Sequence, residues 1–288
     1  MDKKELMEVC KVLSNETRLN ILLWLKDPEQ HFPPQGEHLT EEIDLRGGVC
    51  AGSIFRKTEI AQSTVSHYLD MMQRWATDYP ELCTLDTIGT TVQGRLILAA
   101  HIKGDADDAC PEFFYTSTIH GDELTGYVML LRLIDTLLAS YGNSGRLTEL
   151  VDATHIYINP LANPDGAYYR GDHTVQGARR YNANGIDLNR NFPDPFGGAK
   201  TAGADLHVKN AVEPENLAMM DYAEAHNFRL SANLHGGSEV MNYPWDCFRS
   251  TELAHPQSEW WRQVGKRFVD TARNYDNNRF RDVTGTGY

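Results

Sequence analysis

The 288-residue chain has the composition of a globular protein and carries a strong negative charge. Its 27 Lys and Arg residues against 40 Asp and Glu residues give a net charge of −13, and 41% of the residues are hydrophobic. This balance excludes a disordered chain and gives no overall attraction to nucleic acid or to an anionic membrane. Five scattered cysteines do not make a disulfide framework, and the length is that of about two domains.

We expect neither a membrane span nor a secretory signal peptide. No apolar run reaches the roughly 18 residues that a span needs, because Arg132 and Asp135 interrupt the most apolar stretch, residues 128–138. Near the N-terminus, Glu5 and Glu8 break up the apolar core that a signal peptide requires. The sequence therefore predicts a cytoplasmic protein with no membrane partner.

Residues 1–74 have the pattern of short helices. Apolar residues recur at helical spacing near the N-terminus, and prolines with a Gly-Gly pair predict an irregular segment over 27–48. Two helices, 57–61 and 63–75, are predicted to follow, separated by Gln62.

From Tyr79 onward, predicted strands alternate with predicted helices. The strands are expected over 91–98, 113–119, 154–158 and 230–234, and the helices over 124–141 and 214–226. This alternation predicts an α/β protein with a mixed or parallel sheet flanked by helices. No Gly/Pro/Ser-rich linker separates this part from the helical one, so we place the domain boundary between residues 74 and 75.

A histidine and a glutamate lie three residues apart in the sequence HGDE, directly after the strand predicted over 113–119. His120 and Glu123 can face one point, and Zn²⁺ favours histidine nitrogen and carboxylate oxygen as ligands. His235 follows the strand predicted over 230–234, in the sequence LHGG, and is a third candidate ligand. Open α/β folds usually place their sites at such strand ends. On these residues alone, an ordinary surface H-x-x-E and a strand-capping histidine stay open as alternatives.

Two polar loops lie between these histidines. The first contains NPDG at 163–166, and the second contains RRYNANGIDLNRNFPD at 179–194. Asn, Gly and Asp favour irregular backbone, and guanidinium groups bind carboxylates through paired hydrogen bonds. The loops can therefore fix an anion-binding group, although a solvated polar loop is the simpler alternative.

Taken together, HGDE, NPDG, RYNANGIDLNRNFPD and LHGG resemble the zinc carboxypeptidases of the carboxypeptidase A/E type, in family order, over residues 75–288. The resemblance implies one Zn²⁺ per chain, held by His120, Glu123 and His235. It also implies that Asp187 orients a ligand histidine, His120 by preference. The implied fold is a zinc-carboxypeptidase-like mixed sheet flanked by helices.

The same resemblance implies how a peptide or protein C-terminus would be bound and cleaved. Arg180 would polarise the scissile carbonyl and stabilise the oxyanion, with Arg179 as a weaker alternative. Asn189 and Arg190 would hold the free C-terminal carboxylate, which would make the enzyme an exopeptidase.

The family mechanism also uses a glutamate as general base, well after the third ligand. After His235 the glutamates are Glu239, Glu252 and Glu259, and none has the context of that base. We therefore expect a chain that lacks the C-terminal part of the family's domain, binds zinc and carboxylates, and turns over slowly.

Residues 1–74 resemble an ArsR-type winged helix-turn-helix that lacks its wing, on the sequences LSNETRLNILLWL and EIAQSTVSHYL. The resemblance implies a small all-α domain with a recognition helix over 63–74. Its base contacts would come from Gln62, Ser63, Thr64, Ser66 and His67. The alternative function is therefore a DNA-binding transcription regulator with the peptidase fold as a ligand-binding module. A helical domain with no DNA role, and a join of two incomplete reading frames, stay open. The carboxypeptidase-like part resembles exported proteins, whereas the regulator-like part resembles cytoplasmic ones.

Overall fold

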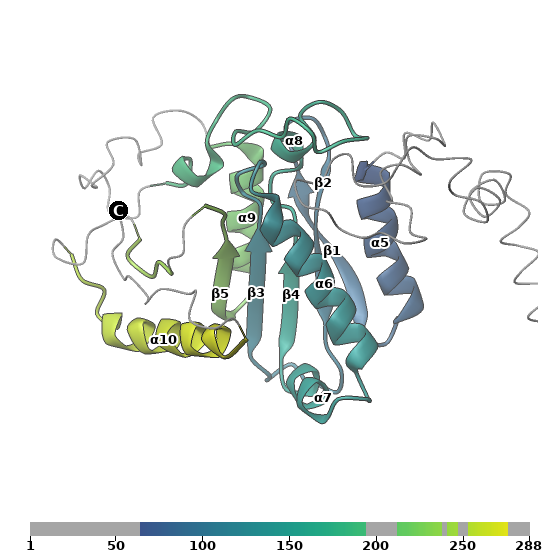
Figure 1. Ribbon diagram of the computed structural model, residues 1–288, viewed down its shortest axis with the longest axis vertical. Helices are drawn as coiled ribbons and strands as arrows, with labels where there is room; N and C mark the ends of the chain where they lie inside the picture. The colour runs from purple at the N-terminus through teal and green to yellow at the C-terminus, as the bar shows by residue number, and fades with distance from the viewer. Residues whose placement is uncertain (1–63, 194–211, 238–240, 247–252, 276–288) are drawn as a thin grey trace, which may run out of the picture. The chain divides into compact units, whose positions relative to one another are not determined.

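The computed structural model describes residues 64–193, 212–237, 241–246 and 253–275 (Figure 1). The chain divides into two compact units, Met1–Ser63 and Thr64–Tyr288, and the description below concerns the second. Its elements are α5 (Thr64–Asp78), β1 (Cys83–Thr90), β2 (Leu96–Ile102), β3 (Glu112–Ser117), α6 (Leu124–Ser140), α7 (Gly145–Asp152), β4 (His155–Asn159), α8 (Pro164–Ala167), the short 3₁₀ helix η1 (Leu188–Arg190), α9 (Pro214–Ala225), β5 (Phe228–Leu234) and α10 (Ser258–Tyr275).

A mixed sheet forms the centre of this unit. In the described residues it has five strands, in the order β1-β2-β4-β3-β5. β1 and β2 form an antiparallel hairpin and β2 is antiparallel to β4, whereas β3 lies parallel to both β4 and β5. Ser117 and Leu234 are partners in the register of β3 and β5. The carboxyl ends of these two strands therefore lie side by side, which is where both candidate histidine ligands follow.

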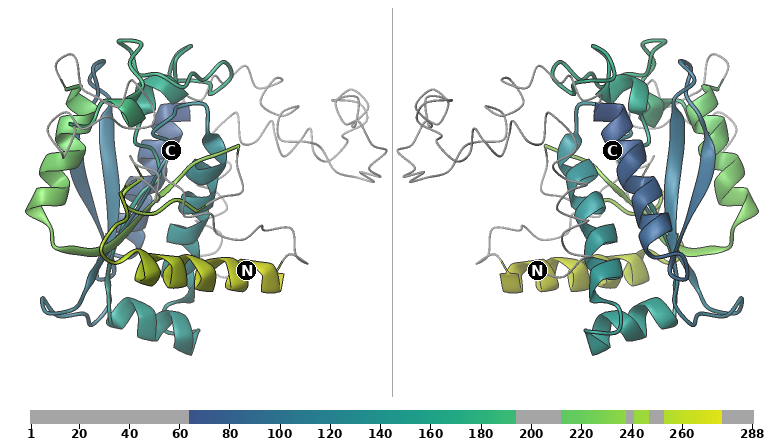
Figure 2. Two further views of the ribbon diagram at one scale, coloured as in Figure 1. Left: turned by 90° about the vertical axis from the view of Figure 1, so that its left-hand side faces the viewer. Right: turned by 90° about the vertical axis from the view of Figure 1, so that its right-hand side faces the viewer.

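Helices cover both faces of the sheet (Figure 2). On one face, α5 and α6 pack with the strands around a core that includes the fully buried Met72, Ile134 and Ile158. On the other face, Tyr222 of α9 packs near Phe114 of β3, with ring centroids 5.7 Å apart, in a core cluster that also contains Ile97 of β2. Each large apolar side chain buried in this way stabilises the fold by about 1.5–3 kcal/mol relative to exposure. The predicted α/β architecture with flanking helices is confirmed.

Helix α5 is a core helix of the sheet unit. Tyr68, Met72 and Trp75 recur at helical spacing and are buried in the same cluster as α6. The domain boundary expected between residues 74 and 75 therefore falls inside a continuous helix, and the compact unit starts at Thr64.

The residues expected to contact DNA lie at or before the start of α5. Gln62 and Ser63 are outside the described residues, and so are the side chains of Thr64, Ser66 and His67. Within the part of the chain that the structure describes, no observation supports DNA binding.

The prediction of a strand over 91–98 is wrong in its first half. Residues 91–95 form the turn between β1 and β2: Thr91 N donates to Arg95 O at 2.9 Å, and Gly94 adopts a φ of 77°. Glycine adopts this left-handed conformation without the steric cost of a side chain. The strand starts at Leu96, and the preceding β1 was missed because Asp86 and Gly89 interrupt its apolar pattern.

The structure agrees with most of the other predicted elements to within about two residues, as expected for boundaries drawn from sequence patterns. Among the described residues, no single helix is long and apolar enough to cross a membrane. Helices α6 and α7 have the length and composition of a span only when they are counted together, and the chain bends by 103° between them.

Candidate metal centre

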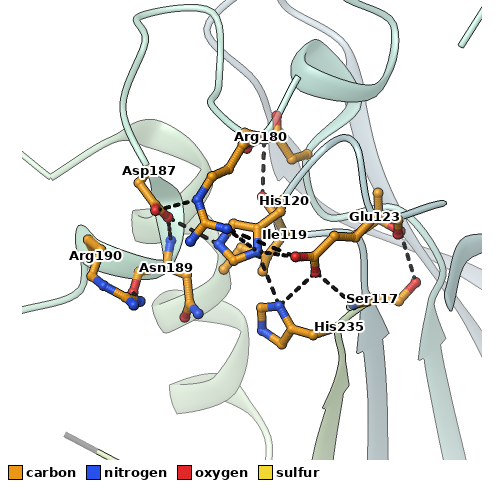
Figure 3. Close-up of polar contacts among 12 residues, drawn as sticks. Ser117, Ile119, His120, Glu123, Arg180, Asp187, Asn189, Arg190 and His235 are labelled. Atoms are coloured by element: carbon orange, nitrogen blue, oxygen red, sulfur yellow. Dashed lines mark hydrogen bonds and ion pairs between the residues drawn. The ribbon is translucent and has the colours of Figure 1, made fainter. Parts of the chain in front are cut away.

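The candidate ligands come from the ends of two adjacent parallel strands. His120 lies three residues after β3, Glu123 directly precedes α6, and His235 follows β5 immediately. Because β3 and β5 pair in register up to Ser117 and Leu234, the turns that follow them occupy the same edge of the sheet. Figure 3 shows the three side chains pointing toward one another.

The ligand atoms of these three residues lie within 4.8 Å of one another. His120 Nδ1 is 2.9 Å from Glu123 Oε1, and His235 Nδ1 is 2.8 Å from Glu123 Oε2. The two Nδ1 atoms lie 3.2 Å apart. Two imidazole nitrogens and a carboxylate, gathered at one point, are a donor set that catalytic zinc sites use.

His120 lies between the candidate ligand group and the carboxylate of Asp187. Its Nδ1 lies 2.9 Å from Glu123 Oε1 and 3.3 Å from Arg180 Nη1, on the side that faces the other candidate ligands. With a metal on Nδ1, Nε2 would carry the proton and donate to Asp187 Oδ1, which lies 3.2 Å away. This tautomer fits a metal ligand that is oriented by a carboxylate behind it.

The turn between β3 and α6 is held in an unusual conformation. Thr118 has a φ of 59°, a left-handed value that costs a β-branched residue free energy. Its Oγ1 donates to the carbonyl oxygen of Glu123 at 3.1 Å, which closes the turn. A side chain at Gly121 would collide with the backbone of Gly166, Ala167 and Arg179, so only glycine fits there.

Glu123 is an anion in this arrangement. Burial alone would raise the pKa of its carboxyl, but the N–H of Gly236, at 3.0 Å from Oε2, and the bond to His120 outweigh burial and lower the pKa. A carboxylate that is ionised at neutral pH is the form that ligates a metal.

Asp187 links the ligand group to the neighbouring arginine. Burial alone would raise its pKa, but hydrogen bonds from His120 and Arg180 and their charges lower the pKa to about 2. Arg180 Nε donates to Asp187 Oδ2 at 2.9 Å, and its Nη1 lies 3.3 Å from His120 Nδ1, so the guanidinium lies beside the candidate ligand group. Arg179 lies elsewhere, with its guanidinium 3.5 Å from the centre of the Tyr169 ring.

Asn189 and Arg190 lie on η1, directly after Asp187. The Asp187 side chain accepts a hydrogen bond from Asn189 N at 3.0 Å and so fixes the start of this short helix. Arg190 Nη1 donates to the carbonyl oxygen of Asn189 at 3.0 Å. Figure 3 shows both side chains on the Asp187 side of the ligand group.

Two polar networks that brace this edge of the sheet were not assigned from the sequence. Asp165 is buried and accepts from Arg95 Nη1 at 2.6 Å and from Thr91 Oγ1 at 2.9 Å. Glu215, also buried, accepts from Val92 N at 3.1 Å and from Asn182 Nδ2 at 3.3 Å. Their partners lie 33 to 123 residues away in the sequence, so no local pattern could reveal them.

The glutamates considered as general bases lie away from this group or outside the described residues. Glu259, on α10, is exposed and pairs with Arg262 at 2.7 Å. Glu239 and Glu252 are outside the described residues.

Comparison with known proteins identifies related sequences over most of the described unit. The sequence profile of the zinc carboxypeptidase family matches residues 68–287. Carboxypeptidase D of Drosophila melanogaster is 43% identical over 176 residues, covering 59% of this chain and 12% of the relative. Carboxypeptidase M of Mus musculus is 39% identical over 176 residues, covering 59% of this chain and 38% of the relative. The matched part is thus well under half the length of either relative.

Solved structures share the fold. A crystal structure of thrombin activatable fibrinolysis inhibitor superposes with a TM-score of 0.68 at 20% identity, over 78% of this chain and 58% of the other. Carboxypeptidase A from Helicoverpa armigera gives a TM-score of 0.61 at 22% identity, over 74% of this chain and 54% of the other. At these identities the likeness establishes the fold of the sheet and its helices.

Proposed function

Because the chain belongs to the zinc carboxypeptidase family, we propose that it binds one Zn²⁺ through His120, Glu123 and His235 and acts on the C-terminal end of peptides. The observation that carries the proposal is the convergence of these three ligand atoms within 4.8 Å, beside a guanidinium group. When bound, zinc supplies Lewis-acid chemistry, which polarises a carbonyl group and makes water more acidic.

Arg180 would stabilise the negative charge that develops on the carbonyl oxygen of the scissile bond. Its Nε is already bonded to Asp187, and its Nη1 lies 3.3 Å from the ligand atom of His120. The guanidinium is therefore fixed before the substrate arrives, and a preorganised charge needs little reorganisation during the reaction.

Asn189 and Arg190 would bind the free carboxylate of the substrate's last residue. A guanidinium and an amide N–H group are suitable donors to a carboxylate. Because η1 follows Asp187 directly, these donors have a fixed position relative to Arg180. A site that needs this carboxylate selects chain ends over internal peptide bonds.

For the 288 residues alone, we expect binding of zinc and carboxylate with slow turnover. Of the three glutamates considered as the general base, Glu259 is the one that lies within the described residues. It pairs with Arg262 on α10. A general base has to lie within hydrogen-bonding reach of the proton that it removes.

The experiment compares one peptide in two forms, with a free C-terminal carboxylate and with a C-terminal amide. With zinc present, we expect release of the last residue from the free-acid form alone, and loss of that activity on chelation. Equal cleavage of both forms, or cleavage that chelation leaves unchanged, would contradict the proposal.

Binding provides a readout that does not depend on turnover. We expect the zinc-loaded protein to bind the free-acid peptide at least about 10-fold more tightly than the amide, a difference of about 1.4 kcal/mol. Arg190→Gln should remove this difference. Arg179→Gln, which changes the arginine stacked on Tyr169, is the matched control and should retain it.

A further inference from the structure

We propose that Asn163 is a positioning residue that fixes the separation between the ligand turn, defined as residues 118–123, and the backbone of Arg180. The inference rests on the proposed function, because it concerns how zinc binding and the oxyanion-stabilising arginine are coupled. The side chain of Asn163 bonds to none of the three proposed zinc ligands and therefore acts through the two segments that it joins.

The side-chain amide of Asn163 is fully buried and has partners on three segments. Its Nδ2 donates to the carbonyl oxygen of Ile119 at 3.1 Å and to that of Arg180 at 3.3 Å. Its Oδ1 accepts from Gly166 N at 2.8 Å. One amide thus joins the residue before His120 to the main chain of Arg180.

Backbone hydrogen bonds converge on the same place. Asn163 N donates to the carbonyl oxygen of Thr118 at 3.1 Å, and Gly121 N donates to that of Arg180 at 3.3 Å. The carbonyl oxygen of Arg180 therefore accepts from both Asn163 and the ligand turn. These bonds hold the main chain of Arg180 in place. The guanidinium of the same residue has to reach the metal-ligating group.

The three segments are also packed too closely for side chains. A side chain at Gly121 would collide with Gly166, and one at Gly166 would approach the carbonyl oxygen of Arg179 to 2.7 Å. Because no free volume separates these segments, a change in the hydrogen bonds of Asn163 is expected to move the ligand turn and Arg180 relative to each other.

Asparagine is the residue that meets this requirement. The site needs one donor group that bonds to two carbonyl oxygens, and one acceptor for an N–H. A side-chain amide provides both. Aspartate has the same shape, but it replaces the donor with an oxygen that faces both carbonyl oxygens. Asn163→Asp therefore removes the bridge with almost no change in volume.

The test compares Asn163→Asp with Asn159→Asp. Asn159 is equally buried, and its Nδ2 donates to the carbonyl oxygen of Leu98 at 2.7 Å. Its Oδ1 accepts from Thr116 Oγ1 at 2.9 Å, and none of these contacts involves the ligand turn or Arg180. Both variants replace a buried side-chain amide with a carboxyl group. The control therefore measures the loss of stability that this replacement causes in general.

We measure the zinc dissociation constant by chelator competition, and the thermal unfolding of the metal-free protein. Both variants should lower the unfolding temperature, while Asn163→Asp alone should raise the zinc dissociation constant by about 10-fold, as outer partners of metal ligands do. Unchanged zinc affinity in Asn163→Asp, with stability lowered as in the control, would overturn the inference.

A second measurement uses the native chain and does not need a variant to fold. Hydrogen exchange is followed at Gly121 N–H, which donates to Arg180 O, and at Arg179 N–H, which donates to Gly166 O at 2.8 Å. Zinc should slow both amides by more than it slows Lys103 N–H, which donates to Leu82 O far from the ligand turn along the chain. Slowing at Gly121 without extra slowing at Arg179 would contradict the coupling.

The two measurements separate this inference from the proposed function. If the native chain binds no zinc, the proposed function fails. If it binds zinc, but Asn163→Asp matches Asn159→Asp and Arg179 is not protected, only the positioning role fails.

Discussion

At the scale of single residues, Asp187 joins three other candidate site residues. Its two carboxylate oxygens face His120 Nε2 at 3.2 Å and Arg180 Nε at 2.9 Å, and one also accepts from Asn189 N. It therefore orients His120, Arg180 and the start of η1 at once.

Asp187→Asn should weaken zinc binding by about 10- to 100-fold, the usual effect of removing a partner behind a metal-ligating histidine. The amide keeps the shape but loses the negative charge that favours the required His120 tautomer. Asp122→Asn is the control, because Asp122 is an exposed carboxylate in the ligand turn that contains His120 and Glu123. Chelator competition measures both, and equal affinities would contradict the assigned role.

The sequence indicated these residues because they belong to motifs with a recognisable chemistry. Asn163 lies in one such motif, NPDG, yet its role could not be predicted. Its partners are the main-chain carbonyl oxygens of Ile119 and Arg180. Every residue has a carbonyl oxygen, so no residue type marks such partners in a sequence.

At the scale of elements, the turn between β1 and β2 is tied to α8 by a buried ion pair. Arg95 Nη1 lies 2.6 Å from Asp165, whose side chain is fully buried, while Arg95 Nη2 pairs with the exposed Asp172 at the same distance. Both acids bind one arginine, but only one of them is shielded from water.

Asp165→Ala should therefore lower the free energy of unfolding by about 3–5 kcal/mol, as loss of one partner of a buried pair does. Thr91 and Gln93 would also lose their acceptor. Asp172→Ala, which removes the exposed acid of the same arginine, should cost about 0–1 kcal/mol. Urea denaturation distinguishes the two, and equal losses would show that burial of Asp165 contributes little.

Strands β2 and β4 are joined by a pair of histidines. His155 Nε2 donates to the carbonyl oxygen of Asp107 at 2.9 Å, and His155 Nδ1 lies 3.0 Å from His101 Nε2. Burial lowers the pKa of His101 to about 4, while the charge of Asp86 opposes this shift and nearby cationic groups add to it. In the unfolded chain, the pKa of a histidine is about 6.5.

Because the folded pKa of His101 is lower than the unfolded one, its contribution to stability is complete above about pH 6.5 and is lost as the pH falls toward 4. His101→Gln should flatten the dependence of the unfolding free energy on pH in this range, by as much as about 1.4 kcal/mol per pH unit. His173→Gln, at an exposed histidine, should leave the slope unchanged. Parallel profiles for native protein and His101→Gln would contradict the assignment.

Element boundaries were predictable where one apolar pattern dominates. Helix α6 was expected over 124–141 and occupies Leu124–Ser140, because its apolar residues recur at helical spacing. The turn at 91–95 was missed because Thr91 and Val92 favour strands, whereas the acceptors that shape the turn, Asp165 and Glu215, lie far away in sequence.

At the scale of the whole molecule, the site depends on the order of the strands. His120 and His235 are 115 positions apart in the sequence and meet because β3 and β5 are neighbours. A metal bound there would connect the two strand ends and act as a cross-link that only the folded chain offers. Zinc at 1,000 times its dissociation constant should stabilise the fold by about 4.1 kcal/mol, measured as a rise in unfolding temperature.

The most direct test of the account is the zinc content of the purified chain after dialysis against trace zinc. We expect one zinc ion per chain in the native protein and in His173→Ala, which changes an exposed histidine. We expect none in His120→Ala, provided that circular dichroism shows the variant to be folded. Full zinc occupancy in folded His120→Ala would contradict the assigned metal centre and the function built on it.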